Sequence, residues 1–147
     1  MPRGCITTII VLATLALVAS ILFYVFIWPD RQREGTSVCI HLIESAMDDY
    51  AADFESYPSG TNSEVAELLL GNNDRDKAYL TKKTVVLRGG EFVDFWKHPL
   101  RFAPAGNGRP AGLSAGPNGE FEDLDDITSQ LIRDIWAADQ DDRRSPN

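Results

Sequence analysis

The hydrophobic pattern of the chain changes from one unbroken apolar run to shorter, periodic segments. No charged residue occurs between Cys5 and Trp28. A helix needs about 20 apolar residues, at about 1.5 Å each, to cross the roughly 30 Å hydrocarbon core of a bilayer. Residues 5–28 therefore predict a transmembrane helix. Tyr24 and Trp28 suit the membrane interface, and Pro29 is expected to end or kink the helix.

A cleaved secretory signal peptide is the alternative interpretation of this segment. Such peptides have an apolar region of about 7–15 residues followed by a small-x-small cleavage site. The present run is longer, and the sequence YVFIWPDRQRE at its end offers no clear site of that kind. A retained anchor is therefore favoured. Its orientation is not determined by charge, because Arg3 lies on one side and Arg31 and Arg33 lie on the other.

An amphipathic helix is predicted between Thr36 and Glu55, where apolar residues recur at steps of three and four. This apolar stripe consists of Ile40, Ile43, Met47, Tyr50 and Phe54. Acidic residues fall on the other faces, namely Glu44, Asp48, Asp49 and Asp53. Pro58 and Gly60 are expected to end the helix. With only a short break near Pro29, it can form one long rod with the transmembrane helix.

A second, shorter helix is predicted over residues 62–70. Thr61 and Glu64 have the spacing of a capping box, in which two side chains satisfy backbone N–H groups at a helix start. Apolar residues follow, and Gly71 suits a C-terminal cap.

The middle of the chain predicts a small antiparallel sheet of about three or four strands. Segments 84–87 and 91–96 flank the turn residues 88–90, which is typical of a hairpin. Residues 100–103 predict a third strand, and residues 104–112 are rich in turn formers. Because such a sheet needs a cover for its apolar face, we expect the amphipathic helix to lie on it. The predicted fold class is α+β.

A closing helix is predicted over residues 127–138, followed by a polar tail. The side chains expected to point inward are Ile127, Leu131, Ile135 and Trp136. Residues 139–147 are polar and are expected to be frayed.

The composition makes the part of the chain beyond the apolar run strongly acidic. The 147 residues include 14 Lys and Arg against 22 Asp and Glu, for a net charge of −8. All of the acids follow Pro29. Nucleic-acid-binding surfaces need clustered Lys and Arg, so nucleic acid is not expected as a partner. The charge fits a solvated acidic face or a cation site.

The segment 118–126 carries the densest group of oxygen ligands. Its side chains are Asn118, Glu120, Glu122, Asp123, Asp125 and Asp126. Calcium takes 6–8 oxygen ligands, which such residues supply, and Gly116 and Gly119 let the backbone curl. The spacing is not that of an EF-hand. The two interpretations are a calcium loop and a solvated acidic loop.

Other reactive side chains are few. His41 is expected on a helix and His98 in a turn, so neither suggests a catalytic pair. The predicted membrane helix separates Cys5 from Cys39, which excludes a disulfide framework. Cys39 is expected to be a small packing residue. Ser114 lacks the context of a nucleophile elbow.

Four short motifs occur in an order known from one protein family. They are Gly4 before the apolar helix, Tyr57-Pro58 after the amphipathic helix, DFWKHPLRF at 94–102, and SAGPNG at 114–119 leading to DDI at 125–127. With these motifs the chain resembles the major pseudopilin of type II secretion systems and related type IV pilin-like proteins. The resemblance covers nearly the whole chain.

This resemblance implies a structural role and no enzymatic activity. It divides the chain into a leader at 1–4, a transmembrane helix at 5–28, a pilin-like periplasmic domain at 29–138 and a polar tail at 139–147. The protein would be a single-pass inner-membrane protein in the lipid bilayer, with its C-terminal domain in the periplasm. It would assemble with other pseudopilin subunits on an inner-membrane secretion platform into a short fibre that drives protein export.

The resemblance also implies two sites. Processing would occur between Gly4 and Cys5, with methylation of the new amino terminus. Calcium would be bound by carbonyl groups and carboxylates of the acidic loop. The implied ligands are Leu113, Ser114, Asn118, Asp123, Asp125 and Asp126.

Some positions depart from the family pattern. Ile9 stands at the fifth position after the expected cleavage, where the family has Glu, and Asn118 stands where the family often has Asp. The departure at Ile9 favours an alternative function, a non-polymerising single-pass membrane protein with a pilin-like calcium-binding module. A membrane-tethered hydrolase is a third, weaker hypothesis, because paired catalytic carboxylates need distinct environments.

Overall fold

The computed structural model describes residues 3–104 and 108–130, and the chain divides into two units. The first unit is Met1–Gln32 and the second is Arg33–Asn147. The prediction for the tail at 139–147 lies outside the described residues, as does most of the predicted closing helix.

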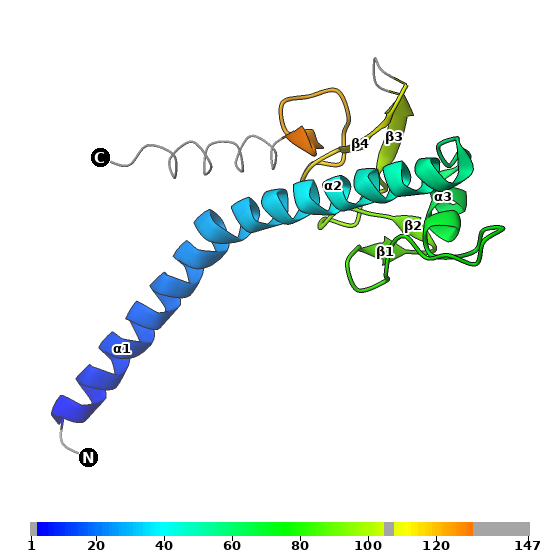
Figure 1. The fold of residues 1–147 in the computed structure, drawn as a ribbon. Helices are drawn as coiled ribbons and strands as arrows, with labels where there is room; N and C mark the ends of the chain where they lie inside the picture. Colours follow the sequence, from blue (N-terminus) through cyan, green and yellow to red (C-terminus); the bar gives the residue numbers. More distant parts are fainter. Residues whose placement is uncertain (1–2, 105–107, 131–147) are drawn as a thin grey trace, which may run out of the picture. The chain divides into compact units, whose positions relative to one another are not determined.

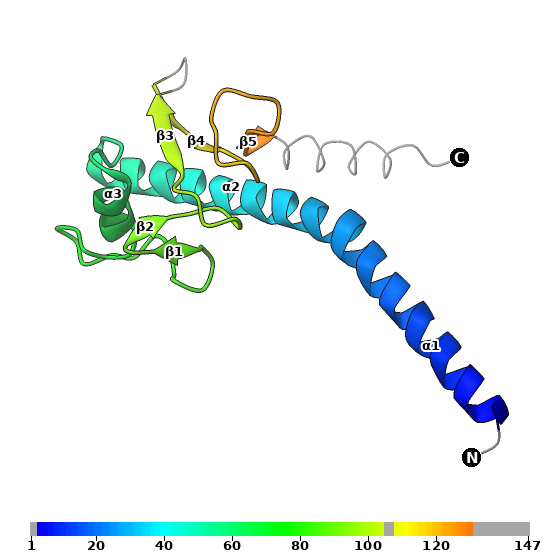
Figure 2. The same ribbon diagram turned by 180° about the vertical axis from the view of Figure 1, so that it is seen from behind.

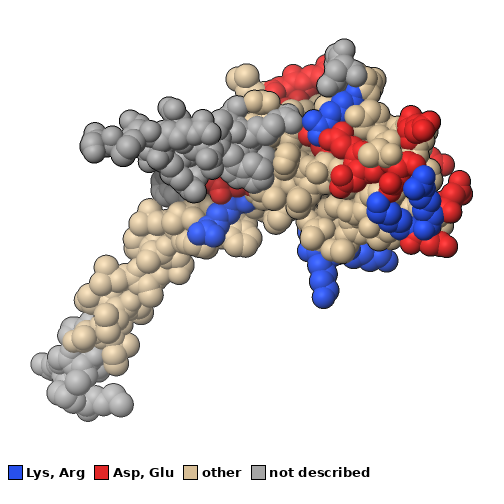
Figure 3. Space-filling view, viewed as in Figure 1, with Lys and Arg blue, Asp and Glu red and all other residues tan. Residues whose placement is uncertain are grey.

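The first unit is helical. Helix α1, Arg3–Leu22, is followed by a π-helical turn η1, Phe23–Ile27, and by the start of α2, Trp28–Phe54. The helix that runs from Thr8 to Phe54 contains a stretch long and apolar enough to cross a membrane. Figure 3 shows no charged side chain over the described surface of α1.

Of the two effects predicted for Pro29, an end or a kink of the helix, the end is wrong, because the helix runs on from Thr8 to Phe54. Pro29 lies in the first turn of α2, where a missing backbone N–H is tolerated. The turn before it is π-helical and is closed by the N–H of Trp28 donating to the carbonyl of Phe23. The π-helical turn is wider than an α-helical turn, and with it the helix continues past Pro29.

The core of the second unit is built on α2. As predicted, the stripe Ile40, Ile43, Met47 and Tyr50 is buried and Phe54 is half-buried. Cys39 is buried too, and burial raises the pKa of its thiol. Other elements add buried apolar side chains to this core, including Val65, Leu69, Leu80, Val85, Phe92 and Leu100.

Helix α3, Asn62–Leu69, has the predicted capping box. The Thr61 hydroxyl accepts the Glu64 N–H at 3.3 Å, and the Glu64 carboxylate accepts the Thr61 N–H at 2.7 Å. Asn62 links this helix to the sheets, because its amide donates to the carbonyls of Phe92 and Leu100 and accepts the N–H of Phe92.

Two antiparallel sheets take the place of the single predicted one. Strands β1, Leu87–Arg88, and β2, Glu91–Phe92, form the predicted hairpin, although both strands are shorter than expected. Strands β3, Arg101–Pro104, β4, Pro110–Ser114, and β5, Ile127–Thr128, form the second sheet in that order. In Figures 1 and 2 the two sheets lie on either side of the α2 ribbon.

Two predictions about this second sheet are wrong. Residues 110–112, expected to be turns, belong to β4, and residues 127–128, expected to start a helix, form β5. Ile127 is nevertheless buried, as expected. Gly112 brings β4 close to α2, because a β-carbon there would lie 2.7 Å from the Cγ2 atom of Ile40.

Glu44, predicted to lie off the apolar stripe, is nevertheless covered by the rest of the fold. Glu44 is buried, and its carboxylate accepts the Gly112 N–H at 2.9 Å and the Ser129 hydroxyl at 2.6 Å. A second polar link joins the same elements, because the Ser37 hydroxyl donates to the Thr128 carbonyl at 2.7 Å. The polar face of α2 therefore helps to fix β4 and β5.

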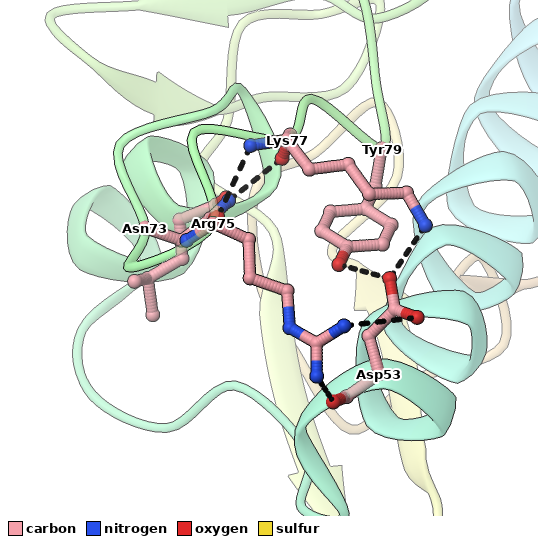
Figure 4. A network of polar contacts seen from close by, with 6 residues as sticks. Asp53, Asn73, Arg75, Lys77 and Tyr79 are labelled. Carbon is pink, nitrogen blue, oxygen red and sulfur yellow. Dashed lines mark hydrogen bonds and ion pairs between the residues drawn. The ribbon is translucent and has the colours of Figure 1, made fainter.

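Asp53, near the end of α2, fastens the loop that follows α3 (Figure 4). Its carboxylate accepts the Lys77 ammonium at 2.5 Å and the Tyr79 hydroxyl at 2.6 Å. The Arg75 guanidinium donates to the Asp53 backbone carbonyl at 2.5 Å, which caps the free carbonyl end of α2. The bonds from Lys77 and Tyr79 lower the pKa of Asp53, and burial together with the Asp53 bond raises the pKa of Tyr79 to about 12.

Candidate functional site

The acidic residues lie in the loop 115–126, which connects β4 to β5. In Figures 1 and 2 this acidic loop lies beside β4, on the side away from α3. Strand pairing closes its base, with Ser114 opposite Ile127. Gly116 has a φ of +63°, and a β-carbon there would lie 2.4 Å from the Asp125 carbonyl oxygen. Only glycine allows the two ends of the loop to approach so closely.

Asn118 organises the interior of the acidic loop. Its amide nitrogen donates to Asp123 Oδ2 at 2.6 Å and to Asp125 Oδ1 at 3.0 Å. Its amide oxygen accepts the Glu120 N–H at 2.7 Å. One neutral amide therefore bridges two carboxylates.

The carboxyl groups of Asp123 and Asp125 change each other's pKa. A hydrogen bond shared between the two side chains lowers the pKa of Asp123 and raises the pKa of Asp125. Burial and the negative charge of Asp123 add to the rise at Asp125. Two neighbouring carboxylates of this kind ionise one after the other as pH rises.

We expect Asp123→Asn to lower the pKa of Asp125 toward the ordinary value for aspartate. The substitution removes the negative charge of Asp123, which helps to raise the pKa of Asp125. The raised pKa means that ionising Asp125 disfavours the folded state, so its contribution to stability is present below the ordinary pKa and is lost as pH rises through the raised value. Carboxyl-carbon NMR of the full chain, labelled at aspartate, measures this pKa. An unchanged titration of Asp125 would show that the two groups are not in contact, and Asp74→Asn serves as a control.

The six ligands implied by the resemblance are not all gathered at one point. Asn118, Asp123 and Asp125 lie together, as described. Asp126 accepts the Glu122 N–H through Oδ2 at 2.9 Å, while its Oδ1 is buried and accepts no hydrogen bond from the described residues. Among the described residues no three Asp, Glu, His or Cys side chains form a group able to hold a metal ion.

The two remaining implied ligands, Leu113 and Ser114, lie in β4 at the base of the loop. The backbone of Leu113 is paired with Thr128 of β5. The Ser114 hydroxyl donates to Asp94 at 2.7 Å and accepts the Gly116 N–H at 3.1 Å. Leu113 and Ser114 therefore fix the base of the acidic loop through these bonds.

Asp94 anchors the acidic loop to the preceding turn. It is fully buried, and its Oδ1 accepts the N–H groups of Trp96 at 2.9 Å and His98 at 2.8 Å. Its Oδ2 accepts the Ser114 hydroxyl, and Nδ1 of His98 lies 2.9 Å from the Gly116 carbonyl. One carboxylate therefore fixes both the turn 94–98 and the base of the loop. Sequence reasoning missed this role. The available signal was an Asp at the start of a turn, where its side chain can accept the backbone N–H groups two and four residues later.

The same residues do not form a catalytic triad. The Ser114 hydroxyl donates directly to Asp94, so the imidazole of His98 does not accept its proton as a general base would. His41 lies on α2 and is half-buried. The proposed processing residues Gly4 and Cys5 lie within α1.

No family model, curated protein or solved structure matches this chain. Its function must therefore be inferred from its own residues and their geometry.

Proposed function

We propose that this protein is a membrane-anchored, pilin-like structural subunit of a fibre that drives protein export. The observation that carries this proposal is the helix from Thr8 to Phe54. It is apolar and uncharged at its beginning, and its later residues supply the apolar stripe of an acidic head. A helix with these two parts can anchor a subunit in a bilayer before assembly and pack against other copies afterwards.

The chemistry of such a subunit is mechanical. The proposed partners are further pilin-like subunits, the lipid bilayer and an inner-membrane platform that adds subunits. The head is proposed to lie in the periplasm. The acidic side chains gather over the end of the second unit that carries α3, with basic side chains among them (Figure 3). No catalytic residue is needed for this role.

The proposal is tested by the intact mass of the protein purified from native membranes. We expect loss of residues 1–4, with methylation of the amino group of Cys5, because a pilin-like subunit is processed before it assembles. Chemical cross-linking in the same membranes is expected to give a ladder of oligomers. A full-length mass together with a monomer after cross-linking would contradict the proposal.

The second candidate is a single-pass protein with the same head that does not polymerise. The observation that favours it is Ile9, an exposed apolar residue at the position where the family has Glu. A carboxylate in an apolar bundle can pair with a neighbour's amino terminus and fix the register between subunits. Ile9 cannot make that pair. A full-length mass and the absence of oligomers are the results that this candidate predicts.

Calcium binding by the acidic loop is part of both proposals. The supporting observations are the neighbouring carboxylates of Asp123 and Asp125, and the buried Oδ1 of Asp126 that accepts no hydrogen bond from the described residues. Binding requires the Asn118 amide to turn, so that its oxygen replaces its nitrogen between the two carboxylates. Calcium would then supply the positive charge that this cluster lacks.

We expect millimolar calcium to raise the melting temperature of the full chain in detergent by at least about 5 °C. A ligand present at about 100 times its Kd stabilises the folded state by ~2.7 kcal/mol, which corresponds to a shift of this size. Circular dichroism with and without a chelator measures it. Asp123→Asn is expected to abolish the shift, and Asp74→Asn is the matched control. An unchanged melting temperature contradicts calcium binding.

A further inference from the structure

The most exposed large apolar side chain of the described second unit lies in the acidic loop. Leu124 is fully exposed, whereas the other exposed large apolar residues of this unit, Leu42 and Phe95, are little more than one-third exposed. Its neighbours on both sides are acidic, from Glu122 to Asp126. The loop therefore presents one exposed apolar side chain with two acidic residues on either side of it in the sequence.

A groove of complementary character is lined by residues of α2, α3 and β3. It has a volume of about 530 Å³ and is mainly apolar. Its lining includes Met47, Pro58, Val65, Leu100, Phe102 and Ala103. Arg101 is the only charged residue among the described residues that line it. The groove thus combines apolar walls with one positive charge.

Arg101 has donors available for an incoming carboxylate. Its guanidinium carbon lies 3.7 Å from the centroid of the Phe121 ring. Stacking of this kind uses the flat face of the guanidinium and leaves the N–H groups at its edge. Among the described residues, no carboxylate forms an ion pair with Arg101. The Asp48–Arg109 ion pair near the groove has no net charge, so the positive charge of the groove is that of Arg101.

We propose that the groove of one copy of this chain receives Leu124 of a second copy. The leucyl side chain would enter the apolar part of the groove, and the carboxylates beside it would face Arg101. This inference rests on the proposed assembly function, and it specifies the surfaces through which the heads meet.

The positions of the two surfaces determine the kind of contact. Leu124 and the groove are different surfaces of one copy, and Arg101 at the edge of the groove stacks on Phe121 of its own acidic loop. A contact that a pair of copies makes once, without its reciprocal, is heterologous. Such contacts leave a free loop at one end and a free groove at the other, and repeating them gives an open fibre or a ring.

Site-directed cross-linking of the full chain in membranes tests this contact. Two differently tagged copies are produced together, one with Glu122→Cys, which keeps Leu124 in the loop, and the other with Ala103→Cys. Both positions are exposed, so neither change is expected to disturb folding. A short bismaleimide is expected to give a dimer that carries both tags. Replacing Ala103→Cys by Ala78→Cys, at an exposed position outside the groove, is expected to reduce the yield to background.

A charge variant tests the role of Arg101. Adding Arg101→Ala to the Ala103→Cys copy is expected to lower the yield of the mixed dimer by up to about fivefold, which corresponds to ~1 kcal/mol for a partly exposed charge pair. Lys82→Ala is the matched control and should leave the yield unchanged. An equal yield with Arg101→Ala would overturn the part of the proposal that concerns charge.

Co-purification of the two tags without any cross-linker separates failure of the contact from failure of assembly. If the tagged copies co-purify but the Glu122→Cys and Ala103→Cys pair gives only the background yield, assembly stands and this contact is wrong. If the copies do not co-purify, the assembly function and the contact both fail.

Discussion

Asp94→Ala will lower the free energy of unfolding of the second unit by about 4 kcal/mol. The substitution leaves two part-buried N–H groups and the buried Ser114 hydroxyl without their acceptor. Each buried donor that loses its partner costs about 1–3 kcal/mol. Urea unfolding of the full chain in detergent, followed by the fluorescence of Trp96 beside the lost carboxylate, measures the change.

Two further variants define the cause of this loss. Asp74→Ala, at an exposed position, is expected to change the free energy of unfolding by no more than about 0.5 kcal/mol. Asp94→Asn keeps one acceptor oxygen and is expected to lose about half as much as Asp94→Ala. Equal stability of the wild type and Asp94→Ala would show that the turn 94–98 and the loop base do not depend on this carboxylate.

Gly116→Ala will destabilise the second unit by about 3 kcal/mol and will open the base of the acidic loop. The φ of +63° is costly for alanine, and the new β-carbon would lie 2.4 Å from the Asp125 carbonyl oxygen and 2.9 Å from Asp125 Oδ2. The two ends of the loop must therefore separate. Thermal and urea unfolding measure the loss, and the same variant is expected to reduce calcium binding.

Gly89→Ala is the matched control for this variant. Gly89 has nearly the same φ, +61°, but no atom lies within 4 Å of the position that a β-carbon would occupy there. Its replacement therefore carries only the backbone cost of a left-handed conformation, about 1–2 kcal/mol. If Gly116→Ala costs no more than Gly89→Ala, the close approach of the two ends of the loop does not contribute.

The features predicted correctly from the sequence are those that local spacing determines. The apolar stripe of α2 follows the helical period, and the Thr61–Glu64 capping box lies within one turn. The hairpin β1–β2 is marked by Gly89 and Gly90, and both have positive φ. Each of these signals acts over a few residues, so the sequence alone contains it.

The features that were missed depend on residues far apart in the chain. Residues 110–112 resemble a turn, but β4 is held as a strand by pairing with β3 and β5 and by the contact of Gly112 with Ile40. Glu44 is buried because its hydrogen-bond donors, Gly112 and Ser129, are 68 and 85 residues away. Periodicity places an acid on an outer face and cannot show that distant donors will cover it.

Only part of the candidate site was predicted, because some of its contacts depend on the folded course of the chain. The acids of residues 118–126 are adjacent in sequence, so their clustering could be foreseen. The pairing of Asn118 with two carboxylates required the actual course of the loop. The role of Asp94 required knowledge that Ser114, 20 residues later, lies beside it.

The position of Asn62 has a consequence for the cooperativity of folding. A hairpin with two-residue strands, such as β1–β2, is not stable by itself. Asn62 completes it from outside, with three side-chain hydrogen bonds to Phe92 and Leu100. Because Asn62 belongs to α3, the hairpin and this helix stabilise each other. The amide protons of α3 and β2 should therefore exchange with solvent as one cooperative unit.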